Sequence, residues 1–389
     1  MRVLVVHNRY RSATPSGEND VVDDDVVRLR AAGVEVETYF RESDEIEFFN
    51  FGQKAGLIVS PIYGRQSAHE VSQALDRFRP DVVHLHNPYP LLSPYVIRVV
   101  KRRGTPVVQT VHNYRHVCMK GTFFRDNQIC LDCSGRTGPV AGIMHGCYRQ
   151  SRPQSAVMAL TLMGHRSTWR LVDRFLPVSD FIGQHLMASG VSPGRIQTIR
   201  NSVRDPGEPT APGSDFLFAG RFDREKGISL LLQAWEASRM ADRSLTILGD
   251  GPLRDVVERA AVNDRIVWLG RVSKEEVGRQ MRASGVVVVP STWYEGLPLT
   301  VAEAYSHGRP VIVSDHGGLS EVVTPETGWR VGPTVLEWVA GLELAASADL
   351  SGPSLAARAY YDEHLRPAQA LAQLLKVYND VAKRPETAS

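Results

Sequence analysis

Two carboxylates, Glu295 and Glu303, lie close together in the stretch Thr292–Glu303 and could act on one ligand. Gly296 allows a sharp turn between them, and Pro298 suits the first position of a helix. We therefore expect Glu295 just before the helix and Glu303 about two turns into it. Carboxylates placed this way reach different parts of a ligand, and hydroxyl groups are their natural partners. The N–H groups of the helix start can hold phosphate oxygens.

The sequence before these residues predicts the element that positions them. Gly285–Pro290 is an apolar, β-branched run with the length and composition of a buried parallel strand. The carboxyl end of such a strand faces a crevice in an open α/β sheet. The alternative for the two glutamates is purely structural, since helix starts often carry Glu for reasons of capping and dipole.

A second segment favours a ligand site. Phe216–Gly227 combines an apolar strand with a glycine-opened loop that carries Arg221 and Lys226. Arginine offers a planar fork for phosphate and lysine a point charge. The pair therefore suits a diphosphate.

The Arg221/Lys226 loop together with Glu295 and Glu303 resembles the retaining glycosyltransferases of family 4, and the resemblance covers nearly the whole chain. It implies an α/β fold of the GT-B type, in which two Rossmann-like, doubly wound parallel-sheet domains face each other across a cleft. We expect an acceptor-binding domain at 1–205, a nucleotide-sugar-binding domain at 206–366 and a helix at 367–389 that returns to the first domain. The segment 205–213, rich in proline and glycine, is the predicted linker.

The resemblance also implies roles for individual residues. Glu303 would bind the ribose and Glu295 the hexose hydroxyls. His112, which follows a predicted strand, would contact the donor sugar from the first domain, and a simply packed histidine is the alternative. The predicted catalytic residues are His112, Glu295, Arg221 and Lys226. The predicted donor site comprises Gly17, Gly220, Arg221, Lys226, Gly251, Arg271, Val272, Glu295, Gly296, Leu297, Leu299, Thr300 and Glu303.

The predicted activity is transfer of a hexose from a UDP- or GDP-sugar to a glycan, lipid-linked or small-molecule acceptor, with retention of anomeric configuration. No cofactor is needed for this chemistry beyond the nucleotide-sugar co-substrate, because Arg221 and Lys226 supply the positive charge. Two alternatives stay open: a nucleotide-sugar epimerase of the same architecture, and a non-catalytic protein that binds sugar nucleotides.

The four cysteines are grouped in one stretch. Cys130 and Cys133 form a Cys-x2-Cys pair, and Cys118 and Cys147 flank it. A cytosolic chain rarely keeps disulfides, whereas four grouped thiols suit a structural zinc ion. The outer spacings do not match a zinc finger closely, so zinc and four ordinary thiols are equal alternatives.

Charge is unevenly distributed along the chain. To residue 205 there are 26 Lys/Arg and 19 Asp/Glu, a balance of +7; the remainder, 45 − 26 = 19 and 43 − 19 = 24, has −5. A basic first half suits anionic lipid phosphates or acidic glycans, although a solvated surface is the commoner explanation of such a balance. Nucleic acid is not an expected partner, because no binding module accompanies the charges.

Composition indicates a globular protein, with 43% hydrophobic and 23% charged residues. No apolar run approaches the roughly 20 residues of a membrane span. Residues 1–7 look like a strand rather than a signal peptide, so we expect a cytoplasmic protein, with peripheral contact to the inner membrane surface allowed. Two further expectations are a strand or buried segment at 55–63 and one amphipathic helix over 154–174. His84 and His86 are interpreted as one packed and one cleft-facing imidazole rather than metal ligands.

Overall fold

The chain divides into two compact units, each built on a parallel sheet. The computed structural model describes residues 1–13, 16–57, 60–134 and 138–383. The first unit comprises Met1–Phe123, Cys130–Ile199 and Ala370–Ser389, and the second comprises Phe124–Ile129 and Arg200–Gln369. Both sheets are covered by helices, so the predicted α/β class with two parallel sheets is confirmed.

The first unit contains a five-stranded parallel sheet in the order β2-β1-β3-β4-β7. Its strands are β1 (Arg2–Arg9), β2 (Glu35–Glu42), β3 (Val82–Leu85), β4 (Val107–Val111) and β7 (Arg174–Pro177). Its helices are α1 (Gly17–Ala31), α2 (Phe51–Gly56), α3 (Arg65–Phe78), α4 (Tyr95–Lys101), α5 (Val140–Met144), α6 (Arg152–Gly164), α7 (Arg166–Trp169) and α8 (Asp180–Ala188).

The last helix, α16 (Pro367–Ala382), completes the core of the first unit. Its buried face, which includes Leu374 and Tyr378, packs in one cluster with Val3 and Val5 of β1 and with the buried side of α1. Leu4 and Val6, which alternate with those valines, are buried as well, so both faces of β1 are covered. A C-terminal helix returning to the first domain was expected, and the structure has it.

The second unit contains a six-stranded parallel sheet in the order β10-β9-β8-β11-β12-β13. Its strands are β8 (Phe216–Ala219), β9 (Leu245–Leu248), β10 (Ile266–Gly270), β11 (Val286–Val289), β12 (Val311–Ser314) and β13 (Gly328–Val331). Its helices are α9 (Ile228–Ala237), α10 (Arg254–Ala260), α11 (Lys274–Ala283), α12 (Leu299–Ser306), α13 (Leu319–Val322), α14 (Val335–Ser347) and α15 (Ser351–Tyr360), and a hairpin of β5 (Phe124–Arg125) and β6 (Gln128–Ile129) is grouped with them.

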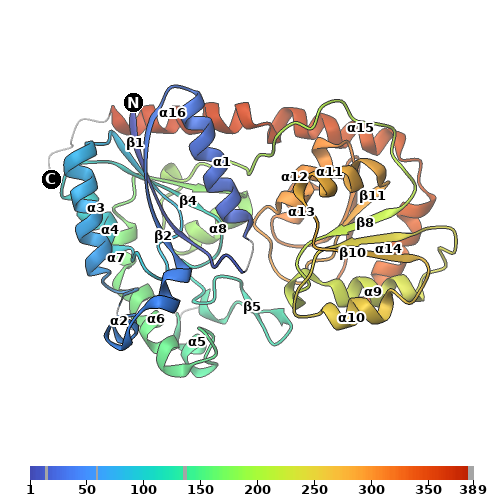
Figure 1. Cartoon of the computed structure of the whole chain (residues 1–389), viewed down its shortest axis with the longest axis horizontal. Helices are drawn as coiled ribbons and strands as arrows, with labels where there is room; N and C mark the ends of the chain where they lie inside the picture. Colours follow the sequence, from blue (N-terminus) through green and yellow to red (C-terminus); the bar gives the residue numbers. More distant parts are fainter. Residues whose placement is uncertain (14–15, 58–59, 135–137, 384–389) are drawn as a thin grey trace. The chain divides into compact units, whose positions relative to one another are not determined.

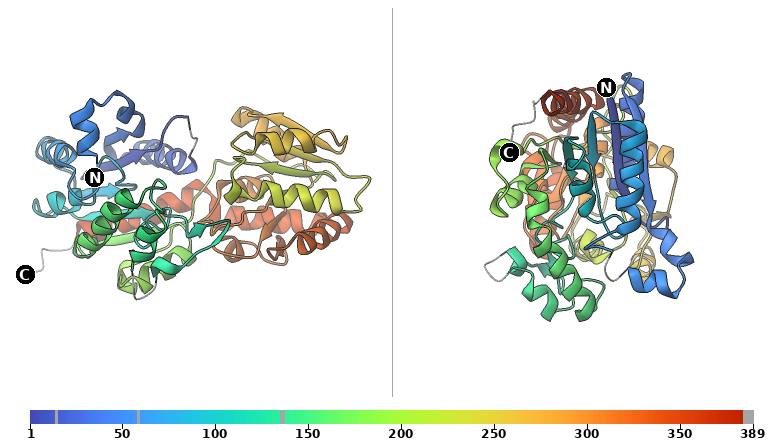
Figure 2. Two further views of the ribbon diagram at one scale, coloured as in Figure 1. Left: turned by 90° about the horizontal axis from the view of Figure 1, so that it is seen from below. Right: turned by 90° about the vertical axis from the view of Figure 1, so that its left-hand side faces the viewer.

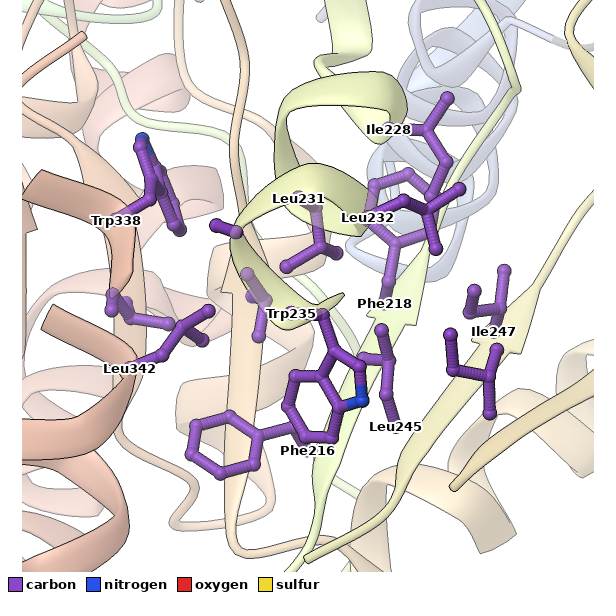
Figure 3. Close-up of a cluster of buried hydrophobic side chains, with 14 of the residues drawn as sticks. Phe216, Phe218, Ile228, Leu231, Leu232, Trp235, Leu245, Ile247, Trp338 and Leu342 are labelled. Atoms are coloured by element: carbon purple, nitrogen blue, oxygen red, sulfur yellow. The ribbon is translucent and has the colours of Figure 1, made fainter. Parts of the chain in front are cut away.

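Helices cover both faces of this second sheet (Figure 1, Figure 2). Every side chain of β11 is buried, which explains its unbroken run of valines. On one face, α9 and α14 bring Trp235 and Trp338 into the core, and the ring of Trp235 meets that of Phe216 edge-on at 5.4 Å (Figure 3). Aromatic groups of this size bury much apolar surface and fix the helices on the sheet.

The segment predicted as the linker packs against the second unit. The fully buried Arg309 donates hydrogen bonds to the carbonyl oxygens of Thr210 (3.0 Å) and Ala211 (3.3 Å), and Asp205 pairs with Arg358 at 3.0 Å. The residues before this segment are bonded to the same unit, since Arg200 pairs with Glu321 at 2.8 Å and Tyr361 donates to the Val203 carbonyl oxygen at 3.0 Å, and the division between the units falls after Ile199.

Two expected elements differ in the structure. The segment 55–63 is not a strand where it is described: α2 ends at Gly56 and turns follow, while residues 58–59 lie outside the described part. The single helix expected over 154–174 is two helices, since α6 ends at Gly164 and α7 covers only Arg166–Trp169. A glycine near a helix end is a common stop, and Arg174 already starts β7.

Within the described ranges, no helix has both the length and the apolar character needed to cross a membrane.

Gly227 provides a test of the architecture, because its backbone adopts φ +71° and a Cβ there would lie 1.7 Å from the carbonyl oxygen of Pro290. We expect Gly227→Ala to lower the free energy of unfolding by at least about 2 kcal/mol, measured by urea denaturation. Gly352→Ala is the matched control, since nothing lies within 4 Å of a Cβ at that helical position. The control should be neutral or slightly stabilising. Equal effects of the two substitutions would contradict this account.

Candidate active site

The loops after β8 and β11 are fastened to each other, because these strands are neighbours in the sheet. The Thr292 N–H donates to the Glu225 carbonyl oxygen at 2.8 Å, and the Thr292 hydroxyl donates to that of Arg224 at 3.0 Å. Gly227 allows the close approach at Pro290. Lys226 is therefore held beside the segment that carries Glu295.

Lys226 and Glu295 form an ion pair. The Lys226 Nζ lies 2.7 Å from Glu295 Oε1. The same oxygen accepts hydrogen bonds from the Ser291 hydroxyl (2.7 Å) and the Trp293 indole N–H (2.8 Å). Glu295 is only 5% exposed, and the ammonium group also lies 5.7 Å from the centre of the Trp293 ring. A buried carboxylate of this kind persists only because it is paired and hydrogen-bonded.

The balance of these effects fixes the charge of the pair. Burial raises the pKa of Glu295, but Lys226 and the hydrogen bonds from Lys226, Ser291 and Trp293 lower it more, so that the pKa is below its ordinary value of 4.5. Glu295 is therefore ionised at neutral pH. An ammonium group has three donors, and the pair with Glu295 uses one, so Lys226 can still donate to a phosphate oxygen while Glu295 holds it in place.

The other predicted residues of the basic loop lie at the same edge of the sheet. Arg221 is exposed and pairs with Asp223 at 3.0 Å. Gly220 donates to the Leu248 carbonyl oxygen at 3.0 Å, which fastens this loop to the end of β9. A Cβ at Gly251 would lie 2.7 Å from the Phe222 nitrogen, so the loop after β9 approaches the basic loop as closely as only glycine allows.

The next loop completes this edge. Gly249 N–H donates to the Gly270 carbonyl oxygen at 2.8 Å. The exposed Arg271 and the half-buried Val272 follow directly after β10. The carboxyl ends of β8, β9, β10 and β11 thus carry all the residues of the second half that the sequence assigns to a donor.

The helix start predicted beyond β11 is present in α12. Pro298 has an extended backbone and is the N-cap residue, so it lies outside the helix. The first helical residue is Leu299, one position later than expected. The Thr300 hydroxyl reaches the Ala219 carbonyl oxygen of β8 at 3.5 Å, and Glu303 is half-buried in the second turn. The N–H groups of this start therefore lie at the end of β8.

Gly296 lies at a bend between Glu295 and Pro298, and in the loop after β12 Gly317 has a left-handed backbone, with φ +63°. A Cβ at Gly318 would lie 1.6 Å from the Gly296 carbonyl oxygen, and the Gly318 N–H donates to the Glu295 carbonyl oxygen at 2.9 Å. Leu297 is buried, and its carbonyl oxygen accepts from Asn201 at 2.9 Å. The position of Glu295 thus depends on a glycine pair from the loop after β12.

In the first unit, the predicted His112 is half-buried and lies beside the buried imidazoles of His84 and His86. His84 lies between Thr110 (2.7 Å) and Tyr378 (2.6 Å), so it is packed on both sides. His86 Nδ1 shares a hydrogen bond of 3.1 Å with His112 Nε2. Burial lowers the pKa of His84 and of His112 to about 3, so these rings are neutral at pH 7.

A small cavity of about 20 Å³ lies in the first unit beside His86 and His112. Glu18, Tyr89 and Arg115 also line it. Four buried polar atoms of these lining residues have no hydrogen-bond partner among the described residues: Glu18 Oε1, His86 Nε2, the Tyr89 hydroxyl and Arg115 Nε. The volume suits one water or one hydroxyl group of a ligand.

Gly17 is the first residue of α1, directly after the extended Ser16 and directly before Glu18. Tyr10 donates to Glu18 Oε2 at 3.1 Å. Burial raises the pKa of Glu18 above 4.5, although His7 and Arg115 act in the opposite direction. The predicted glycine thus introduces a carboxylate whose other oxygen lines the cavity.

The four cysteines lie in the first unit. Cys118 is buried and the other three are half-buried. Burial, followed by the neighbouring thiols, raises the pKa of Cys133 to about 11. In the described part of the chain, no group of three or more His, Cys, Asp or Glu side chains is arranged to hold a metal ion, so the predicted zinc site gains no support from the geometry.

Sequence reasoning missed several residues of these sites. Ser291 and Trp293 hold Glu295, and Tyr89 and Arg115 line the small cavity. A tryptophan two positions before a glutamate was a visible signal, since indole N–H groups usually find an acceptor when buried. Tyr89 and Arg115 gave no signal, because they come from different loops that only the folded sheet brings together.

Comparison with known proteins gives two family matches. Residues 16–202 match the model described as "Glycosyl transferase 4-like domain", and residues 213–344 match "Glycosyl transferases group 1". A glycogen synthase of Mycobacterium tuberculosis is 27% identical over 294 residues, 72% of this chain and 63% of that protein. The match covers 29% of the length of an uncharacterized glycosyltransferase of Methanocaldococcus jannaschii and 63% of that glycogen synthase, so the chain spans less than two thirds of either relative.

Two solved structures share the fold over nearly the whole chain. Sucrose-phosphate synthase from Thermosynechococcus elongatus has a TM-score of 0.72 at 18% identity and 98% coverage of both chains. Anabaena HepE in complex with UDP-glucose has a TM-score of 0.65 at 15% identity, covering 98% of this chain and 100% of its own. At these identities the likeness concerns the fold alone.

Replacing Lys226 should show how much free energy of unfolding is lost when the buried Glu295 carboxylate has no cationic partner. We expect Lys226→Met to lower the free energy of unfolding by about 3 kcal/mol at pH 7, because Glu295 is left charged and unpaired. The double variant Lys226→Met/Glu295→Gln should lose less than the two single variants together. Urea denaturation measures all of them. Lys376→Met, at an exposed position of α16, is the control and should be neutral.

The pH dependence checks the same pair. The folded-state pKa of Glu295 lies below 4.5, so the pair stabilises the fold above that pH and its contribution is lost as the pH falls through the folded-state value. The difference between the natural chain and Lys226→Met should therefore shrink on acidification. A difference independent of pH would refute the ionic account.

The cysteine hypothesis stays a prediction of the sequence and has a direct test. If Cys118, Cys130, Cys133 and Cys147 bind zinc, protein purified without a metal-binding tag should contain about one equivalent, and Cys130→Ser/Cys133→Ser should lower the unfolding temperature and abolish zinc retention. Elemental analysis measures the metal. Less than about a tenth of an equivalent in fully folded protein would leave four ordinary thiols.

Proposed function

Because the chain belongs to the GT-B glycosyltransferases, we propose that it moves a hexose from a nucleotide diphosphate sugar to an acceptor hydroxyl, with retention of anomeric configuration. The family number within this group is not fixed by the matches. The proposed acceptors are glycans, lipid-linked sugars or small molecules. The nucleotide sugar is the co-substrate, and the positive charge needed at the diphosphate comes from the protein.

The observation that carries this proposal is the Lys226–Glu295 pair at the end of β8. A diphosphate leaves readily only if its growing negative charge is met. Lys226 is fixed by a 2.7 Å contact, and the start of α12 at Leu299 and Thr300 lies at the same strand end. A fixed ammonium group and helix N–H groups need no rearrangement when charge develops, and this is the condition for electrostatic catalysis.

The remaining donor residues have roles that agree with their positions. Glu303 would bind the ribose from the second turn of α12, where it is half-buried. Arg221 would exchange its partner Asp223 for a phosphate oxygen. Glu295 would both orient Lys226 and accept hydroxyl groups of the hexose.

The first unit supports an acceptor role. The small cavity beside His86 and His112 has the size of one hydroxyl group, and donors and acceptors without partners line it. His112 is neutral, so it can exchange hydrogen bonds with sugar hydroxyls without repelling a cationic transition state. Contact of this unit with acidic glycans or with the inner membrane surface agrees with its excess of basic residues and remains part of the proposal.

The solved neighbours support a UDP-sugar as the donor in the proposed transfer, and the relatives support a role in polysaccharide biosynthesis. HepE was solved in complex with UDP-glucose. The sequence of the glycogen synthase matches 72% of this chain. A thermal-shift screen of UDP-, GDP- and ADP-sugars, followed by mass spectrometry with acceptor extracts, tests the proposal. A glycosylated product supports it. An altered free sugar nucleotide without acceptor indicates an epimerase, and binding without turnover indicates a sensor; either result would overturn the proposed transfer.

Replacing the proposed ribose ligand should weaken donor binding selectively. We expect Glu303→Gln to raise the donor Kd roughly ten- to a hundredfold, because charge-assisted hydrogen bonds are worth about 1.5–3 kcal/mol. Calorimetry with the donor found in the screen measures it. Glu236→Gln, at an exposed position of α9, is the matched control and should keep the natural Kd. Unchanged binding by Glu303→Gln would remove this residue from the site.

A further inference from the structure

The first unit contains a second, larger cavity that neither the family matches nor the donor chemistry accounts for. It measures about 640 Å³, within the usual range of ligand pockets. His116 and Trp169 line both this cavity and the small one beside His86 and His112. The two cavities are therefore neighbours within one unit.

The charge of the larger cavity comes from arginines. Arg166, Arg170 and Arg195 line it, and none of its described lining residues is Asp or Glu. Arg195 donates to the carbonyl oxygen of Arg170 at 2.5 Å, so its position is fixed by the backbone. No carboxylate of the described chain forms an ion pair with these three residues. Three guanidinium groups without a counter-ion favour an anionic occupant.

The two histidines that line the larger cavity, His116 and His185, add no positive charge. Burial lowers the pKa of His116 to about 4, and it lowers the pKa of His185 below its ordinary value. The ring of His116 lies 4.3 Å from that of Trp169 and 5.7 Å from that of Phe175. One side of the cavity is thus an uncharged aromatic wall.

Trp169 gives a second, independent indication of a ligand. The residue is only 8% exposed, and its indole Nε1 is a buried donor without a partner among the described residues. A buried N–H group without an acceptor costs free energy that a ligand oxygen would recover. Three exposed arginines and this tryptophan thus line the larger cavity, and Trp169 lines the small cavity as well.

From these observations we infer that the arginine-lined cavity binds a phosphate ester carried by the acceptor, while the adjoining small cavity takes the attacking hydroxyl. Arginine forks match phosphate oxygens in pairs, and three positive charges offset the two or three negative charges of a phosphate or diphosphate. The aromatic wall takes the sugar or apolar part attached to the phosphate. The inference rests on the proposed transfer, because it identifies the chemical class of its acceptor.

The test uses binding rather than activity. Calorimetric titration of the full chain with glucose 1-phosphate and, separately, with dodecyl phosphate below its micelle concentration should show binding. Arg166→Gln/Arg170→Gln should weaken it at least about tenfold, because two charged hydrogen-bond donors are lost. Lys376→Gln/Lys383→Gln removes the same charge from exposed positions elsewhere on the first unit and should leave the Kd unchanged. Arg195 is kept, since it also bonds the backbone.

Trp169→Phe keeps an aromatic ring but removes the N–H donor, and it should weaken phosphate binding a few-fold. Tighter binding of dodecyl phosphate would assign the phosphate to a lipid-borne acceptor, and tighter binding of glucose 1-phosphate to a soluble one; both support the inference. Absence of binding to both probes, or equal weakening by the arginine and lysine double variants, would overturn it. Binding of nucleotide sugars, measured in parallel, shows whether the proposed transferase itself has failed.

Discussion

The buried ion pair between Lys226 and Glu295 is the contact on which the candidate donor site depends. Glu295 is almost fully buried, and a carboxylate there is tolerated only because Lys226, Ser291 and Trp293 all donate to one of its oxygens. The pair joins the loops that follow β8 and β11. A contact that costs desolvation energy in this way is poor evidence for stability, but it fixes the direction of an ammonium group.

Glycine determines whether those loops can come together. Gly227 approaches Pro290, Gly251 approaches Phe222, and Gly318 approaches Gly296, each so closely that a Cβ would overlap backbone atoms. The carboxyl ends of parallel strands lie at one edge of the sheet, and these close approaches pack the loops at that edge against one another. The same packing explains why the donor residues assigned in the second half are spread over 84 positions of sequence, from Gly220 to Glu303.

The first unit contains a group of buried polar side-chain atoms that lack hydrogen-bond partners among the described residues. The imidazoles of His84 and His112 are neutral, and several buried polar atoms near His112 have no partner in the described chain. Buried polar groups are normally hydrogen-bonded, so this concentration marks a place where a ligand completes the bonding. We propose that the neighbouring arginine-lined cavity holds an anion. Part of the excess of basic residues in the first half is thus concentrated in the three arginines that line this cavity.

The resemblance to a known family implied the two-domain arrangement and the returning C-terminal helix. The sequence by itself determined the parallel strands, the helix starts and the loop that carries Arg221 and Lys226. These follow from local signals: β-branched runs, strand-to-helix turns and helix starts. It also placed Glu295 before a helix and Glu303 within it. Only the tertiary structure decided that Lys226 pairs with Glu295, that Gly318 packs against the backbone of Gly296, and that Tyr89 and Arg115 border one cavity. Each of these depends on atoms from loops distant in the chain, and a one-dimensional pattern holds no information on which loops meet until the sheet order is fixed.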